Sequence, residues 1–167
     1  PCLLWFAPFI PHWPNNNPER FLNNYKKRTQ SIEEAKYWAS CEWFDETCGA
    51  LFDLLEKNRL EKDTLILFVS DNGWIQGERE RQSIRSKRSP YEAGIRTPIM
   101  LRWPGVIKPN RDTVTPVNAV DMVPTALHAA GFNNSNSYPG INLMNLQALE
   151  KRRSIFSADY SVEMVTM

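Results

Sequence analysis

Apolar residues gather in short runs along this chain, separated by one long stretch with helical periodicity. Residues 2–10, 65–69 and 97–103 are apolar enough to predict strands, and the first of these reads as a strand buried on both faces. Residues 31–59 place apolar side chains close to helical spacing, and their opening S-I-E-E is a capping-box pattern. Strands alternating with helices favour an α/β fold with a largely parallel sheet.

The second half of the chain contains a shorter predicted helix. Asp121 is the expected N-terminal cap of this helix. The helix is expected to run to Ala130 and to stop at Gly131. Residues 155–158 predict one further strand. Polar stretches without periodicity predict loops at residues 15–28, 74–90 and 133–140.

Composition is that of a soluble globular domain. The 167 residues are 42% hydrophobic and 23% charged, with a formal net charge of +1. This charge gives no electrostatic reason to expect a nucleic-acid partner, and no apolar run approaches the ~20 residues of a membrane span. Cys41 and Cys48 fall seven residues apart on the predicted long helix. That is roughly 10 Å of axial rise, too far for a disulfide.

Both ends of the chain predict a piece of a longer domain. Pro1 opens directly into an apolar strand, and residues 155–167 also resemble strand material that is cut short. The lack of a signal peptide therefore says nothing about location.

Asp71 and Asn72 are the first candidates for chemistry, because they directly follow the predicted strand at residues 65–69. Ligand sites in open α/β sheets lie beyond the carboxyl ends of strands. Asp and Asn oxygens are hard donors that suit Ca²⁺ or Mg²⁺. A simple Asn-Gly turn explains the same residues, so both interpretations stay open.

His12 and Lys87 are the other two candidates. His12 lies within a proline-rich stretch that restricts the backbone, and an imidazole is a general acid or base near neutral pH. Lys87 lies in a polar loop and could pair with an anionic substrate. An ordinary surface histidine and a solvated loop cation are the alternatives.

Five motifs, in order along the chain, resemble those of the sulfatase family within the alkaline-phosphatase-like superfamily. Residues 63–73, D-T-L-I-L-F-V-S-D-N-G, resemble the family's D-T-L-V-I-F-T-S-D-N-G signature. Residues 87–98, K-R-S-P-Y-E-A-G-I-R-T-P, resemble its K-x-x-x-Y-E-G-G-x-R-x-P segment. The other three are the P-H-x-P strand end at residues 7–14, the long helix at 43–60 and the D-x-x-P-T-L-L helix at 121–127.

The resemblance implies an incomplete alkaline-phosphatase-like three-layer sandwich with a mostly parallel sheet. Residues 1–150 would be the C-terminal part of the catalytic domain, and residues 151–167 the start of a truncated C-terminal strand region. The implied activity of the parent protein is sulfuric ester hydrolysis. The implied partners are a sulfated small molecule or carbohydrate and the missing N-terminal half of the same domain. Secreted, periplasmic or lysosomal location is expected from the family.

The resemblance also implies roles for individual residues. Asp71 and Asn72 would bind a metal, Ca²⁺ or alternatively Mg²⁺ or Mn²⁺, His12 would lie near the leaving oxygen, and Lys87 would contact the sulfate. The family's nucleophile is a formylglycine made from cysteine in a C-x-P-x-R or C-x-A-x-R motif, and none of the three cysteines occurs in one. That motif and the family's paired aspartates normally precede the position of Pro1. Formylglycine is therefore expected in the missing N-terminal part, and the chain alone is expected to be inactive.

Three questions remain open at the level of sequence. Trp74 and Trp13 could stack on a sugar or aryl ring of the substrate, or simply pack. A phosphodiesterase or phosphonate hydrolase of the same superfamily is an alternative to a sulfatase. A non-catalytic binding module that retains the fold is the second alternative.

Overall fold

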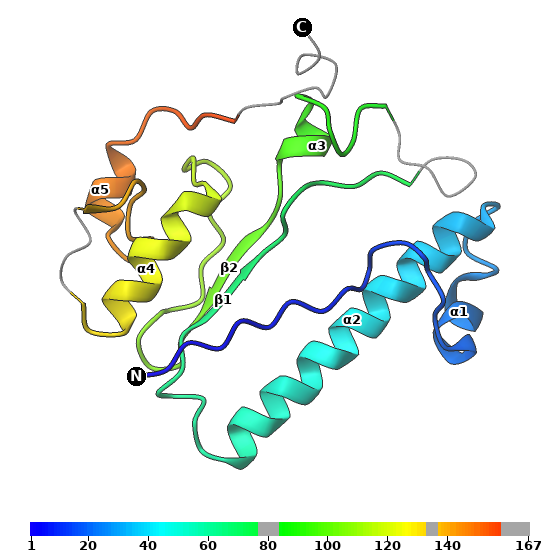
Figure 1. Ribbon diagram of the computed structural model, residues 1–167, viewed down its shortest axis with the longest axis horizontal. Helices are drawn as coiled ribbons and strands as arrows, with labels where there is room; N and C mark the ends of the chain where they lie inside the picture. Colours follow the sequence, from blue (N-terminus) through cyan, green and yellow to red (C-terminus); the bar gives the residue numbers. More distant parts are fainter. Residues whose placement is uncertain (77–83, 133–136, 158–167) are drawn as a thin grey trace, which may run out of the picture. The chain divides into compact units, whose positions relative to one another are not determined.

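The computed structural model describes residues 1–76, 84–132 and 137–157 (Figure 1). The chain divides into two compact units, each assembled from segments that are distant in sequence. The first unit comprises Pro1–Cys2, Glu61–Asn72 and Arg96–Met167, and the second comprises Leu3–Leu60 and Gly73–Ile95.

The second unit is built on the helices α1 (Glu19–Tyr25) and α2 (Ile32–Lys57), which lie side by side (Figure 1). The predicted long helix is confirmed, and Ser31 caps it by accepting a hydrogen bond from the Glu34 amide at 3.2 Å. Phe21 of α1 is buried and stacks on Trp43 of α2 with ring centroids 6.4 Å apart. This aromatic contact fastens the short helix to the long one.

Two sequence predictions for this unit were wrong. The expected surface loop at residues 15–28 contains α1, because burying Phe21 against α2 stabilises a helix that the polar composition concealed. The expected buried strand at residues 2–10 is an exposed, irregular segment, with Leu3 82% and Trp5 84% exposed. A strand needs a hydrogen-bonded neighbour, and the one sheet among the described residues contains only β1 and β2.

The first unit contains the strands β1 (Ile66–Val69) and β2 (Ile99–Arg102), so both central strand predictions are confirmed. They pair antiparallel, with Ile66 opposite Arg102 and Val69 opposite Ile99. The sequence led us to expect a mostly parallel sheet, and this pair does not show one. Apolar periodicity reports which residues are buried but not the direction in which neighbouring strands run.

The helices α4 (Met122–Ala129) and α5 (Leu146–Glu150) complete the first unit, and the 3₁₀ turn η2 (Ala119–Asp121) precedes α4. The stop at Gly131 is confirmed, with φ of 86° and a hydrogen bond from its amide to the His128 carbonyl at 3.0 Å.

Asp121 is the N-cap residue of α4, as predicted, but its side chain makes no cap hydrogen bond to the helix. Its carboxylate instead accepts from the backbone amides of Asn118 and Ile141, both at 2.8 Å, and pairs with Arg152. The expected strand at residues 155–158 is also wrong as far as it is described, since residues 155–157 are exposed coil and residue 158 lies outside the described residues.

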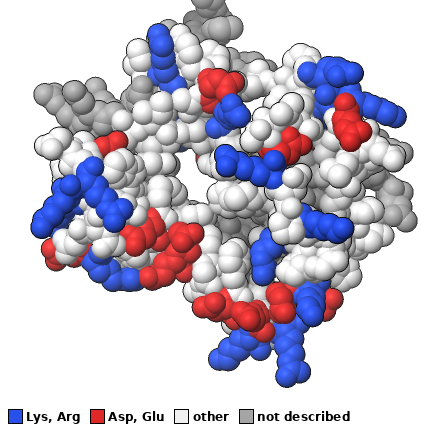
Figure 2. Space-filling view, turned by 180° about the vertical axis from the view of Figure 1, so that it is seen from behind, with Lys and Arg blue, Asp and Glu red and all other residues white. Residues whose placement is uncertain are grey.

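The surface carries charges of both signs. Lysine and arginine side chains lie among aspartates and glutamates over the face in Figure 2, as a net charge of +1 leads one to expect. Among the described helices, none combines the length and apolarity that crossing a membrane requires.

Candidate active site

Asp71 and Asn72 follow β1 directly, as predicted from the sequence. After Val69, the backbone bends at Asp71 and Asn72, and the Ser70 hydroxyl donates to the Asn72 carbonyl at 3.0 Å. Asp71 is exposed and Asn72 is half-buried. The strand therefore delivers a carboxylate and a carboxamide to a turn that solvent can reach.

These two side chains suit a hard cation in donor chemistry but not in number. Ca²⁺ takes 6–8 oxygen ligands, and Asp71 with Asn72 offers a single formal charge and few oxygens. Within residues 1–76, 84–132 and 137–157, no three histidine, cysteine, aspartate or glutamate side chains are grouped so that they could hold a metal ion. The described residues thus supply at most part of a metal site.

His12 lies in the second unit, on a tight turn that follows the exposed N-terminal segment. Its backbone amide donates to the Phe9 carbonyl at 3.0 Å, and its ring lies against that of Phe9 with centroids 4.9 Å apart. The ring Nδ1 is 2.7 Å from the Trp13 carbonyl oxygen. Because a carbonyl oxygen can only accept, Nδ1 carries a proton in this contact. Nε2 is then the ring nitrogen left to exchange a proton with a ligand.

Lys87 also lies in the second unit, in a segment held by its serine neighbours. The hydroxyl of buried Ser86 accepts from the Ile75 amide at 2.6 Å, and the Ser89 hydroxyl donates to the Ser86 carbonyl at 2.6 Å. These two bonds lie on either side of half-buried Lys87. The lysine therefore extends from an ordered turn.

Two glycines permit close backbone approach beside this turn. The Gly73 amide donates to the carbonyl of Gly94 at 2.8 Å. Gly94 belongs to the short helix α3 (Glu92–Ile95). A Cβ on Gly73 would lie 2.1 Å from the Ala93 carbonyl oxygen, and one on Gly94 would lie 2.3 Å from that of Ser86. Neither position has room for a side chain, so both glycines are required by packing.

Trp74 packs against α2. Its ring lies 6.2 Å from that of Tyr37, tilted by 41°, and its Nε1 donates to the Gln76 side chain at 3.2 Å. The Trp74 residue is half-buried. Trp13, the other candidate for stacking, is 50% exposed.

The structure sorts the predicted residues into two sets. Asp71 and Asn72 belong to the first unit, whereas His12, Trp74 and Lys87 belong to the second. Within the second unit, the bond between Ile75 and Ser86 joins the Trp74 segment to the Lys87 segment. Sequence reasoning missed the side chains that support these segments, because nothing in the periodicity of the chain distinguishes them. They are Asn15, Asn17, Ser40, Ser86 and Ser89.

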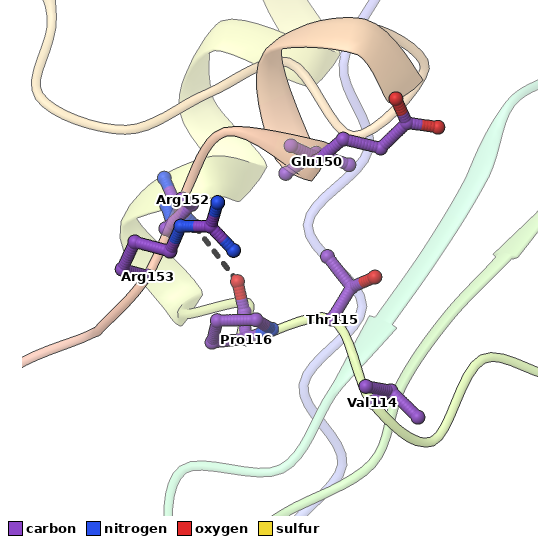
Figure 3. Close-up of a pocket in the computed structure, with 7 residues that line it drawn as sticks. Val114, Thr115, Pro116, Glu150, Arg152 and Arg153 are labelled. Atoms are coloured by element: carbon purple, nitrogen blue, oxygen red, sulfur yellow. Dashed lines mark hydrogen bonds between the residues drawn. The ribbon is translucent and has the colours of Figure 1, made fainter.

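A pocket of about 260 Å³ lies in the first unit (Figure 3). None of the predicted site residues lines it. Arg152 on its wall donates to the Pro116 carbonyl at 3.4 Å and is also engaged by Asp121. The pocket is lined by Val114, Thr115, Pro116, Leu149, Glu150, Arg152 and Arg153.

Comparison with known proteins shows the class. The Sulfatase family model matches residues 1–132, which is most of the chain. The chain is 33% identical over 139 residues to the uncharacterized sulfatase YdeN of Escherichia coli, covering 80% of this chain and 24% of that protein. It is 33% identical over 145 residues to choline-sulfatase of Rhizobium meliloti, covering 84% of this chain and 27% of that protein.

Solved structures agree. The crystal structure of Ps i-CgsB matches with a TM-score of 0.70 at 26% identity, covering 85% of this chain and 32% of that chain. The same protein has been solved in complex with k-i-k-neocarrahexaose, and that structure matches at 24% identity.

The chain therefore belongs to the sulfatase family. Its relatives include proteins named as choline-sulfatase and arylsulfatase, so the family is one of sulfate ester hydrolases. Its fold is consistent with the α/β fold of its solved neighbours. The chain spans only about a quarter of the length of the two curated relatives above.

Proposed function

We propose that the protein to which this chain belongs hydrolyses sulfate esters. The observation that carries the proposal is the position of Asp71 and Asn72. They stand directly after β1, at the end of the residues that resemble the family's D-T-L-V-I-F-T-S-D-N-G signature. Family membership supplies the reaction class, and this strand end supplies donors of the right chemistry.

Each proposed residue has a role that its surroundings support. Asp71 and Asn72 contribute oxygens to a site for Ca²⁺, or alternatively Mg²⁺ or Mn²⁺, and that ion, when bound, helps to neutralise the sulfate. Lys87 places a cation against the sulfate oxygens, where charge must be balanced as the S–O bond breaks. When both ring nitrogens carry protons, His12 gives the Nε2 proton to the leaving oxygen, while its Nδ1 proton stays bonded to the Trp13 carbonyl.

Close backbone packing supports the Lys87 turn in this proposal. Gly73 is covalently next to Asn72, and its amide bonds Gly94 in the second unit. Gly94 in turn lies tightly against Ser86, the neighbour of Lys87. This series of contacts supports an ordered position for the Lys87 turn within the second unit.

The remainder of the site is proposed to lie outside this chain. It comprises a formylglycine nucleophile and further carboxylates on the N-terminal half of the domain. With them, the sheet becomes the mostly parallel centre of a three-layer sandwich. Residues 1–150 then form the C-terminal part of the catalytic domain, and residues 151–167 begin a C-terminal strand region. An exported or lysosomal location follows from the same proposal.

A sulfated carbohydrate is the proposed substrate class, with a smaller sulfated molecule as the alternative. Support comes from a structural neighbour that was solved in complex with k-i-k-neocarrahexaose, which is a property of that neighbour. Trp74 contributes a partly accessible ring that a sugar could contact, although its face toward Tyr37 is already occupied.

The test is turnover of an aryl sulfate by the whole protein. His12→Ala and Asp71→Ala should each lower kcat/KM by roughly 10²-fold or more, since general acid–base catalysis alone contributes 10²–10⁴-fold. His128→Ala is the matched control and should retain activity. Wild-type activity in His12→Ala and Asp71→Ala would overturn the proposal. Faster cleavage of a phosphodiester than of the sulfate would instead favour a phosphodiesterase.

A further inference from the structure

We propose that Asn15, Asn17 and Ser40 form a polar anchor that positions His12 by tying its turn to helix α2. The value of this anchor for catalysis rests on the role proposed for His12 above. The anchor itself stands on hydrogen bonds within the second unit, and its effect on the histidine can be measured without turnover.

Asn15 connects the histidine turn to the helix. Its side-chain amide donates to the Pro11 carbonyl at 3.0 Å and to the Ser40 hydroxyl at 2.9 Å. A carboxamide has two N–H groups, so both donors are satisfied. Pro11 immediately precedes His12, and Ser40 lies in the N-terminal half of α2. The Asn15 side chain therefore connects Pro11, the residue before the histidine, to Ser40 of α2, which lies 25 positions after Asn15 in the sequence.

Ser40 and Asn17 complete the anchor. The Ser40 hydroxyl donates to the Asn17 side-chain oxygen, and the Asn17 amide donates to the Lys36 carbonyl of α2 at 2.9 Å. Each donor in this series meets an acceptor, so the direction of every bond is determined. Ser40 is only 1% exposed. The bonds to Ser40 hold their geometry firmly, because breaking one leaves the buried hydroxyl without water to replace its partner.

The anchor fixes the backbone on both sides of His12. Before it, the Pro11 carbonyl is held by Asn15, and after it, residues 15 and 17 are held on α2. Between these points, the ring bonds the carbonyl of Trp13. That bond keeps the proton on Nδ1. The protonation of Nε2 therefore depends on the Trp13 backbone staying in place. Misplacement of about 1 Å can cost 10²-fold in rate.

Nuclear magnetic resonance of ¹⁵N-labelled histidine tests the positioning directly. The full chain has two histidines, and His128 on α4 is the internal reference. For the neutral ring, wild-type His12 should show one protonated Nδ1 and one unprotonated Nε2. Ser40→Ala and the near-isosteric Asn15→Leu should both move the two His12 nitrogen signals toward each other, as the tautomers begin to average. The His128 signals should not move.

Two further variants separate positioning from general loosening. Thr47→Val removes another hydroxyl from α2, one that bonds the Trp43 carbonyl of its own helix, and should leave the His12 signals unchanged. Ser40→Thr restores a hydroxyl and should return the signals toward their wild-type positions. Far-UV circular dichroism checks that α2 persists. If Ser40→Ala loses α2, Asn15→Leu at the half-buried edge of the anchor decides the question.

Unchanged His12 signals in a folded Asn15→Leu variant would overturn the proposal, as would averaged signals in the wild-type chain. Turnover separates this result from the proposed function. If His12→Ala leaves the whole protein fully active, the catalytic role of His12 fails, while the response of its ring to Asn15→Leu still establishes the anchor. If the role holds, Asn15→Leu should lower kcat by roughly 10- to 100-fold.

Discussion

Asp121 and Arg152 form a two-point ion pair in which both carboxylate oxygens meet guanidinium nitrogens, at 2.5 and 2.7 Å. The Asp121 side chain is fully buried and that of Arg152 is 13% exposed. The same carboxylate accepts from two backbone amides, those of Asn118 and Ile141. The ion pair and these two hydrogen bonds therefore connect η2, Ile141 and the end of α5 at one buried point.

Breaking this pair should strongly destabilise the protein. Arg152→Ala leaves the buried Asp121 carboxylate without its counter-ion, and such losses cost about 3–5 kcal/mol of unfolding free energy. Urea unfolding measures it. The matched control is Arg20→Ala, because Arg20 and Glu46 form the same two-point geometry at 2.6 Å but are more than half exposed. An equal loss in both variants would contradict the importance of burial.

Stability should also fall in acid through Asp121. Burial by itself raises the pKa of this carboxyl. Hydrogen bonds from Arg152 and the two amides lower the pKa by a larger amount, so its net value is below the usual one. The unfolded chain has the ordinary pKa of about 3.9. The stabilisation is therefore complete above that pH and is lost as the pH falls through the folded pKa.

The comparison of wild type with Asp121→Asn between pH 2 and pH 6 tests this dependence. The asparagine variant should be less stable near pH 6 and lose less stability on acidification. Some acid dependence should remain. Hydrogen bonds from the Thr115 side chain and from the Thr115 and Val114 amides lower the pKa of Asp112 to about 2. Parallel stability curves for the two proteins would show that Asp121 does not contribute.

Glycine 94 should be intolerant of a side chain. In Gly94→Ala the new Cβ would lie 2.3 Å from the Ser86 carbonyl oxygen, so the Lys87 turn must shift. Overpacking of this kind typically costs 1–3 kcal/mol. Gly49→Ala is the control: Gly49 lies within α2 with nothing within 4 Å, and alanine there should add roughly 0.5–1 kcal/mol. Thermal unfolding distinguishes the two, and a stabilised Gly94→Ala would contradict the close contact.

Local patterns predicted the elements that are stabilised by nearby residues. The cap at Ser31, the period of α2 and the helix stop at Gly131 each depend on a few neighbouring positions, and all three are confirmed. The strands β1 and β2 also follow from short, mainly apolar runs. The helix α1 was missed because its stability comes from one buried contact, between Phe21 and a helix that follows it in sequence.

The candidate site was predictable as a set of residue types but not as an arrangement. Asp71 and Asn72 could be placed after a strand because the strand itself is a strong signal. Ser40 could not be connected to His12, since its partners lie 23 and 25 positions away and its own neighbours in sequence form an ordinary helix. Long-range hydrogen bonds leave no periodic trace in the chain.

The three free cysteines should differ in reactivity. Burial raises the pKa of Cys41, and a hydrogen bond from Tyr37 offsets only part of that increase. Cys2 is exposed. Because the thiolate is the reactive form, iodoacetamide at pH 8 should modify Cys2 well before Cys41, as followed by mass spectrometry of peptides. Tyr37→Phe should slow Cys41 further, and urea should make the two rates equal. Equal rates in the folded chain would contradict the partial burial of Cys41.

Calcium should bind this chain only weakly. Asp71 and Asn72 follow β1 with one formal charge between them, and the described residues contain no group of three acidic, histidine or cysteine side chains that could hold the ion. Affinity falls as charged ligands are removed, so we expect a Kd no tighter than about 10⁻⁴ M, in the range of the weakest protein calcium sites. Calcium titration followed by the amide signals of residues 70–73 measures it, and Asp71→Ala should abolish the response. A Kd below about 10⁻⁶ M for the chain alone would mean that it carries more of the metal site than these two residues.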